Sequence, residues 1–294
     1  MRRREFVGFL AAGLAPAWTR REQFVERWSW VMGQSVHVMV FAGSEQQGLD
    51  ACAAVLAELR RVESRLSLFE DASDLCELNR HAGGGPMHVD EDLRMLLARA
   101  ADFRRLTAGA FDVAVEPLMR AWGFDAPRQG SPSTAELAEA REAVATAEVR
   151  LEGATARLPN AHTQLDFGGI GVGYGIDRAL AVLRARGITR AFIDVSGDCA
   201  AIGAPPGERA WLVEIADPAH EGGVIATTRL RDAALATSGN TVRPHVLNPA
   251  TGRPADALRQ ASVVTADATS ADALSTAMLV SGRRPATVLR AYAV

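Results

Sequence analysis

The chain has 294 residues, of which 48% are hydrophobic, so it is long enough to bury a sizeable core. Its formal net charge of −3 gives no electrostatic reason to expect a nucleic-acid partner. The sequence contains arginine but no lysine, which excludes Schiff-base and pyridoxal-phosphate chemistry and the lysine of a phosphate-binding P-loop.

The N-terminus has the pattern of an export signal. A charged segment, Met1–Val7, precedes a short apolar segment at 8–14 and the small-x-small site Ala15-Pro-Ala17. Arg3-Arg4-x-Phe6-Val7 fits the twin-arginine pattern. We therefore predict a twin-arginine-type signal at 1–17, a mature domain at 18–294 and a product located in the periplasm or cell envelope. A basic tail without a targeting role is the alternative.

The first half of the mature chain alternates between strand and helix patterns. Residues 28–42 are predicted to form a strand with Met32-Gly33 in its middle, and Ser44 is predicted to cap a helix over 46–66. Further helices are predicted over 90–107 and, capped by Thr134, over 134–147. Two short strands, at 148–151 and 154–158, follow that helix.

A glycine-rich stretch occupies the middle of the chain. Residues 163–167 are predicted to form a strand carrying Asp166, the glycines from 169 to 175 a turn, and 176–186 a helix. Closely spaced glycines allow a backbone to approach a ligand, and a helix start offers free N–H groups to an anion. This pattern favours a phosphate-bearing ligand. The alternative is a tight strand-to-helix turn with close packing.

The second half is predicted to consist mostly of strands, at 190–195, 211–215, 224–230 and 234–237, with helices over 270–280 and from 285 onward. Helices and strands that do not alternate regularly favour an α+β fold over a doubly wound sheet.

A carboxylate and a hydroxyl, Asp272 and Thr276, lie four residues apart in the predicted helix over 270–280. They therefore share one helix face and can take two positions around a hard cation such as Mg²⁺. Two structural alternatives stay open. Thr269-x-x-Asp272 is also a capping-box pattern, and the Thr276 hydroxyl can bond to the carbonyl of residue 272.

Histidine and cysteine offer few other candidate sites. His245 lies in a turn-rich segment and is a candidate base, with an ordinary surface histidine as the alternative. Cys52, Cys76 and Cys199 have no metal-ligand spacing and are predicted to be core residues.

Several short motifs together resemble the FAD:protein FMN transferases, the periplasmic flavin transferases of the ApbE type. Any one is weak, but they occur in the family's order along nearly the whole mature chain. They are Met32-Gly33, Leu66-Ser67-x-Phe69 with Ser73-x-Leu75, Gly109-x-Phe111-Asp112, Trp122-Gly123-Phe124, Leu165-Asp-x-Gly-Gly-Ile-x-x-Gly-Tyr-x-x-Asp177, Ala236-Thr-Ser-Gly239, His245-x-x-x-Pro249-x-Thr251-Gly252 and Ala271-Asp-Ala-Leu-x-Thr276.

The resemblance implies an α+β fold of mixed, mostly antiparallel sheets packed with helices. It implies an enzyme that uses Mg²⁺ to move FMN from FAD onto a threonine or serine hydroxyl of an acceptor protein, releasing AMP. The acceptor would be a membrane redox complex or a periplasmic flavoprotein. By match, Gly169, Asp272 and Thr276 would hold the metal, and His245 would be the base. The flavin nucleotide would contact Met32, Phe69, Ala110, Phe111, Asp112, Asp166, Val172 and Val246.

The chain departs from the family pattern at several positions. Gly171-Val172-Gly173 stands where many members have Ala-Lys-Gly, Ser196-Gly197 where Gly-Gly is usual, and Asn248 where aspartate is usual. The segment 238–245 is also short, and the chain ends soon after its last predicted helix. These departures keep a second reading open, a periplasmic FAD-binding protein without transferase turnover. A dinucleotide-binding oxidoreductase is a third reading, although the glycines do not fall in GxGxxG and no further βαβ units follow.

Overall fold

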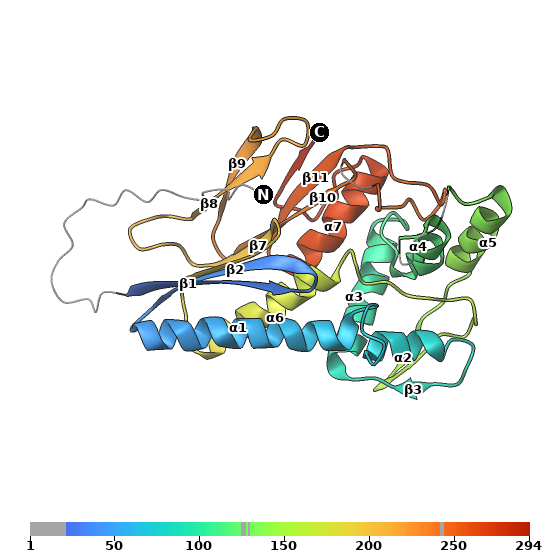
Figure 1. The fold of residues 1–294 in the computed structure, drawn as a ribbon, viewed down its shortest axis with the longest axis horizontal. Helices are drawn as coiled ribbons and strands as arrows, with labels where there is room; N and C mark the ends of the chain where they lie inside the picture. Colours follow the sequence, from blue (N-terminus) through green and yellow to red (C-terminus); the bar gives the residue numbers. More distant parts are fainter. Residues whose placement is uncertain (1–21, 125–127, 129, 242–243) are drawn as a thin grey trace.

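A seven-stranded antiparallel sheet forms the centre of the computed structural model, which describes residues 22–124, 128, 130–241 and 244–294 (Figure 1). The predicted signal at 1–17 lies outside the described residues. The strand order is β1-β2-β6-β7-β10-β11-β12. The strands are β1 (Gln23–Val31), β2 (Gln34–Ala42), β6 (Ala191–Val195), β7 (Asp198–Ile202), β10 (Ala233–Gly239), β11 (Gln260–Thr265) and β12 (Arg290–Ala293).

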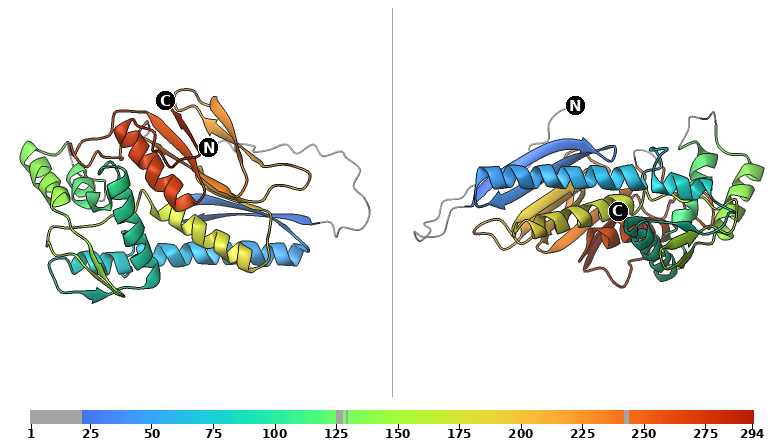
Figure 2. Two further views of the ribbon diagram at one scale, coloured as in Figure 1. Left: turned by 180° about the vertical axis from the view of Figure 1, so that it is seen from behind. Right: turned by 90° about the horizontal axis from the view of Figure 1, so that it is seen from below.

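Three helices cover one face of this sheet (Figures 1 and 2). They are α1 (Glu45–Leu66), α6 (Gly171–Ala185) and α7 (Ala268–Ser281). Helix α1 packs on β1 and β2, α6 on β6 and β7, and α7 on β10 and β11. A hairpin of β8 (Trp211–Ala216) and β9 (Val224–Leu230) packs through Trp211 against Phe192 of the sheet, in a second apolar cluster.

The remaining elements gather at one end of the sheet (Figure 1). They are α2 (Asp74–Arg80), α3 (Glu91–Leu106), the 3₁₀ helix η1 (Val113–Val115), α4 (Glu116–Trp122), α5 (Thr134–Ala145) and a small sheet of β3 (Met87–His88), β5 (Thr155–Arg157) and β4 (Arg150–Glu152). The α+β prediction is thus confirmed. Within the described ranges, no helix has the length and apolar character needed to cross a bilayer.

Capping residues and apolar spacing in the sequence predicted the long helices correctly to within a few residues. Helix α1 buries Cys52, Val55, Leu59 and Val62 at helical spacing, and the Ser44 side chain accepts a hydrogen bond from the Gln47 N–H, as predicted. The cap of α5 is Ser133, one residue before the predicted Thr134. The buried positions of Cys52 and Cys199 agree with the prediction that they are core residues, whereas Cys76 is only partly buried.

The strand predicted over 28–42 is instead a hairpin, in which β1 and β2 pair across Met32-Gly33. Met32 has φ 57° and Gly33 φ 67°, so both turn residues are left-handed. A two-residue turn with two positive φ angles matches the twist of the flanking strands and reverses the chain.

Two further predictions were wrong. Residues 163–167 are not a strand, because the Asn79 side chain takes the place of a neighbouring strand: it accepts from the Leu165 N–H at 2.8 Å and donates to the Leu165 carbonyl at 2.9 Å. The helix predicted from residue 285 onward is absent. Residues 290–293 instead form β12, which pairs with the otherwise open edge of β11.

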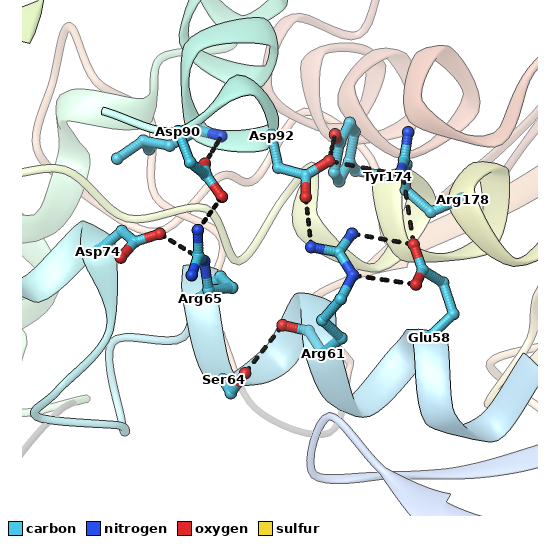
Figure 3. A network of polar contacts seen from close by, with 10 residues as sticks. Glu58, Arg61, Ser64, Arg65, Asp74, Asp90, Asp92, Tyr174 and Arg178 are labelled. Atoms are coloured by element: carbon cyan, nitrogen blue, oxygen red, sulfur yellow. Dashed lines mark hydrogen bonds and ion pairs between the residues drawn. The ribbon is translucent and has the colours of Figure 1, made fainter. Parts of the chain in front are cut away.

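A network of ion pairs fastens α3 and α6 to α1 (Figure 3). Arg61 of α1 contacts Glu58 at 2.9 Å and Asp92 of α3 at 2.5 Å. The Tyr174 hydroxyl of α6 donates a hydrogen bond to the same Asp92, and Arg178 reaches Glu58 at 3.3 Å. Because Tyr174 lies in the first turns of α6, this network fixes the helix start that carries the glycine motif.

Candidate functional site

A cavity of about 320 Å³ lies where the ends of β7 and β10, the starts of α6 and η1, and helix α7 meet. It brings together most of the residues predicted from the sequence. Its lining includes Ala110, Phe111, Asp112, Asp166, Gly169, Val172, His245, Val246, Asp272 and Thr276. Segments that are more than 150 residues apart in the chain, such as 110–112 and 272–276, thus face one space.

Two predicted ligand-contact residues do not line this cavity. Met32 lies in the β1–β2 turn and packs against the core near Gly175, although Gln34, two residues further on, does line the cavity. Phe69 follows α1 and is 83% exposed. The structure therefore does not place these two side chains with the others.

The glycine motif is mostly helical. Helix α6 begins at Gly171, five residues before the predicted start at 176. A Cβ on Gly173 would lie 2.2 Å from the Ala268 carbonyl oxygen, and one on Gly175 would lie 3.2 Å from Leu59. At these two positions the glycines serve close packing, which was the alternative to ligand contact. Gly168 and Gly169, before the helix, line the cavity.

The three predicted metal ligands lie on one wall. A Cβ on Gly169 would be 3.2 Å from the Thr276 Oγ1, so these two residues are neighbours. The Asp272 side chain faces the cavity from one turn away on α7, and its Oδ2 accepts a hydrogen bond from the Gly173 N–H at 2.9 Å. Asp272 is only 5% exposed. All three supply oxygen donors, which hard divalent cations prefer.

Both structural alternatives for Asp272 and Thr276 were wrong. The cap of α7 is Asp267, which accepts from the Ser270 N–H at 2.9 Å, so Thr269 and Asp272 do not form a capping box. Ser275, rather than Thr276, bonds to the Asp272 carbonyl. The Thr276 Oγ1 instead lies 3.1 Å from the Ser238 Oγ.

Helix α7 is held against α6 by Asp177. Its buried carboxylate accepts hydrogen bonds from the Ala268 N–H at 2.8 Å, the Thr269 N–H at 2.9 Å and the Thr269 hydroxyl at 2.5 Å. Asp177 and Gly173 are one helical turn apart, so the same face of α6 fixes both the start of α7 and the Asp272 carboxylate.

Asp198 is a second acid in the cavity wall. Its Oδ1 accepts a hydrogen bond from the Thr237 N–H at 2.9 Å. The pKa of Asp198 is raised to about 7. Burial is the largest cause and the charge of Asp194 adds to it, whereas the hydrogen bond from the Thr237 N–H opposes the shift. Burial, and then the charge of Asp198, raise the pKa of Asp272 well above its usual range. The two acids therefore disfavour each other's ionised form.

Neither acid has a basic partner among the residues that the structure describes. Among the ion pairs in the described ranges of the chain, none involves Asp198 or Asp272. Buried carboxylates are normally paired or bound to a metal. This arrangement fits a cation in the cavity better than it fits a structural ion pair.

Asp112 and Asp166 also line the cavity. Asp112 caps η1: its Oδ1 accepts from the Ala114 N–H at 2.9 Å and its Oδ2 contacts Arg104 at 2.8 Å. Burial raises the pKa of Asp112 although both of these contacts oppose the shift. Asp166 accepts from the Gly168 N–H at 2.7 Å. Both acids thus shape the loops beside the cavity.

His245 and Val246 are held over the cavity by Asn240. The Asn240 Oδ1 accepts from the Val246 N–H at 2.9 Å, and its Nδ2 donates to the Val246 carbonyl at 2.9 Å. This fixes the backbone on which His245 faces the cavity.

Sequence reasoning missed several residues of the lining. Asp198, Gln34 and Ser238 were not singled out as ligands. The available signal for Asp198 was an acid directly after a Ser-Gly turn at the end of a buried strand. Ser196, with φ 50°, and Gly197, with φ 108°, form that turn and direct Asp198 into the cavity wall.

Comparisons with known proteins agree on one family. A sequence model described as the ApbE family matches residues 32–292. A curated relative named FAD:protein FMN transferase, from Rhodobacter capsulatus, is 32% identical over 290 residues and covers 94% of this chain. The match spans 55% of that relative, so the chain corresponds to about half its length. A relative of the same name from Treponema pallidum is 31% identical over 281 residues, covering 86% of this chain and 77% of that protein.

Solved structures share the fold. The ApbE protein of Thermotoga maritima superposes with a TM-score of 0.79 at 30% identity, over 88% of this chain and 87% of that chain. The Pseudomonas stutzeri flavinyl transferase ApbE, in its apo form, also gives 0.79, at 26% identity, over 88% and 85%.

Proposed function

The chain belongs to the ApbE family, and we propose that it is an FAD:protein FMN transferase that depends on Mg²⁺. In this proposal it moves FMN from FAD to a threonine or serine hydroxyl of an acceptor protein and releases AMP. The observation that carries the proposal is the single cavity in which Gly169, Asp272 and Thr276 face His245 and the 110–112 turn.

The residues present fit a divalent cation. Gly169, Asp272 and Thr276 offer a carbonyl, a carboxylate and a hydroxyl oxygen, and Asp272 is buried without an arginine partner in the described chain. Mg²⁺ commonly takes few protein ligands and completes its shell with phosphate oxygens and water. When bound, the ion would neutralise the charge of the pyrophosphate.

The remaining lining residues would position the substrate and move one proton. Ala110, Phe111, Asp112, Asp166, Val172 and Val246 would contact the flavin nucleotide. The acceptor hydroxyl oxygen attacks the phosphorus of the FMN half, the bond from that phosphorus to the bridging oxygen breaks, and AMP leaves with the bridging oxygen. His245 takes the proton of the attacking hydroxyl. Such a transfer needs alignment and charge neutralisation more than covalent help from the protein.

The cellular setting is part of the same proposal. The twin-arginine-type pattern at 1–17 supports export to the periplasm or cell envelope. The acceptor would be a membrane redox complex or a periplasmic flavoprotein that exposes the modified hydroxyl. Val172 lines the cavity without a charge, so the cation would supply the positive potential that a lysine gives in many family members.

Metal-dependent cleavage of FAD tests this proposal. The purified protein is incubated with FAD and Mg²⁺, with and without candidate acceptor domains, and AMP and the acceptor mass are measured. We expect AMP release that requires Mg²⁺, and a flavin-sized mass gain on a true acceptor. Asp272→Asn should abolish both, whereas Asp217→Asn, at the β8–β9 turn outside the cavity lining, should change neither. FAD that binds but stays intact would instead identify a flavin-binding protein without turnover.

A further inference from the structure

Asp198 is an acid of the cavity wall for which the proposed function has no role. It is the first residue of β7, and it lines the cavity together with Asp272 and Thr276. Its Oδ1 accepts the Thr237 N–H at 2.9 Å, while its Oδ2 receives no hydrogen bond from any residue in the described part of the chain. One carboxylate oxygen is thus anchored, and the other is available to the cavity.

Two adjacent residues of β10, Thr237 and Ser238, contact Asp198 and the predicted cation ligand Thr276, respectively. Thr237, which donates to Asp198, is followed by Ser238 on β10. The Ser238 Oγ lies 3.1 Å from the Thr276 Oγ1 and 2.7 Å from the Ser275 Oγ, on the face of α7 next to Asp272. The β7 and β10 ends therefore present Asp198 beside the same wall of the cavity.

We propose that Asp198 supplies a second carboxylate to the divalent-cation site, as an acceptor for the water that completes the ion's coordination shell. This inference rests on the proposed function, because it adds a residue to that site. Two carboxylates balance the charge of one divalent ion, and neither Asp198 nor Asp272 has an arginine or histidine ion-pair partner in the described ranges. Groups that hold metal-bound water in place are worth about 10- to 100-fold in metal affinity.

The test is a titration with Mn²⁺ alone, which is followed by electron paramagnetic resonance of the free ion. Asp198→Asn and Asp198→Ser both remove the charge, and Asp198→Asn also keeps an oxygen at the position that accepts from the Thr237 N–H. We expect each to weaken Mn²⁺ binding by about 10- to 100-fold, with an unchanged far-UV circular dichroism spectrum. Using two variants keeps the test valid if one of them does not fold.

Asp217→Asn is the control for a change of charge. Asp217 is an acid at the β8–β9 turn that accepts from the Ala219 N–H at 2.8 Å, and it does not line the cavity. This variant should bind Mn²⁺ within twofold of the unmodified protein, a margin of about 0.4 kcal/mol.

The outcomes separate this inference from the proposed function. If Asp272→Asn loses Mn²⁺ binding while both Asp198 variants bind like the unmodified protein, the role of Asp198 is refuted and the cation site stands. If the Asp198 and Asp217 variants weaken binding equally, a general charge effect explains the result and the inference also fails. If the unmodified protein does not bind Mn²⁺, or if Asp272→Asn binds Mn²⁺ as well as the unmodified protein does, the cation site itself is refuted, and the proposed function is refuted with it.

Discussion

Adding one methyl group at Gly173 should lower both the stability of the protein and its rate of FAD cleavage. In Gly173→Ala, the new Cβ would meet the Ala268 carbonyl oxygen at 2.2 Å, the Ala268 carbonyl carbon at 2.7 Å and the Asp272 Cβ at 2.8 Å. These are backbone or backbone-proximal atoms that cannot rotate away. Helices α6 and α7 must therefore move apart by roughly 1 Å, because packed interiors hold no spare volume.

The expected effect has two parts. Overpacking of this kind costs about 1 to 3 kcal/mol in unfolding free energy. The displacement also pulls Asp272 from the Gly173 N–H, its partner at 2.9 Å, and a misplacement of about 1 Å at a reacting centre lowers turnover by about 100-fold. Urea unfolding and Mg²⁺-dependent AMP release from FAD measure the two parts separately.

Gly171→Ala is the matched control in the same helix. Its Cβ would meet only the Phe167 Cβ, at an ordinary 3.7 Å. We expect the unfolding free energy of Gly171→Ala to equal that of the unmodified protein or to exceed it by up to about 1 kcal/mol, because alanine is a better helix former than glycine. If Gly173→Ala unfolds and cleaves FAD like the unmodified protein, or if both variants lose the same amount, the close crossing of α6 and α7 does not position Asp272.

Three further predictions follow from the contacts around the site. Asp177→Ala should lower the unfolding free energy in urea by about 1 to 2 kcal/mol, because the first turn of α7 loses its acceptor, and Asp177→Asn, which keeps one oxygen acceptor, should lose less. His245→Asn should slow FMN transfer by about 100-fold or more in single-turnover assays while FAD affinity by fluorescence quenching stays unchanged, and loss of both would refute a base role. Arg61→Met should lower stability more at pH 7 than at pH 3, measured by urea unfolding. The pKa of Glu58 is lowered, mainly by the hydrogen bond from Arg61, although burial opposes this. For Asp92, burial raises the pKa, but the hydrogen bonds from Arg61 and Tyr174 and the nearby arginine charges together lower it further, so the net shift is also downward. Both pKa values are below their ordinary 4.5 and 3.8, so this stabilisation is present above about pH 4.5 and disappears as the pH falls through the folded-state values. An equal destabilisation at both pH values would contradict it.

Local chemistry explains what could be predicted without a structure. Ser44 caps α1, and the apolar spacing along that helix matches its buried face, because both signals act within a few residues of the chain. The order of short motifs identified the family, and the Asp272–Thr276 spacing placed two oxygen-bearing side chains on one helix face, where both line the cavity. The cap, the apolar spacing and the shared helix face needed only residues within a few positions of each other, and the family needed only the order of motifs along the chain.

Tertiary packing decided the rest. The glycines at 173 and 175 were predicted to form a turn, but they lie inside α6, where a crossing helix and Leu59 leave no room for a side chain. The apolar run at 163–167 is not a strand, and a side chain distant in the sequence, Asn79, takes both backbone hydrogen bonds of Leu165.

The grouping of the site residues also depends on the fold. Asp198 reaches the cavity because β7 lies beside β10 and Thr237 holds its carboxylate, whereas Phe69, in a family motif, lies in an exposed loop outside the lining. The sequence by itself determined which side chains have the chemistry to bind a cation and a phosphate. Only the tertiary structure decided which of them share one cavity, because contacts between residues far apart in the chain leave no periodic signal along it.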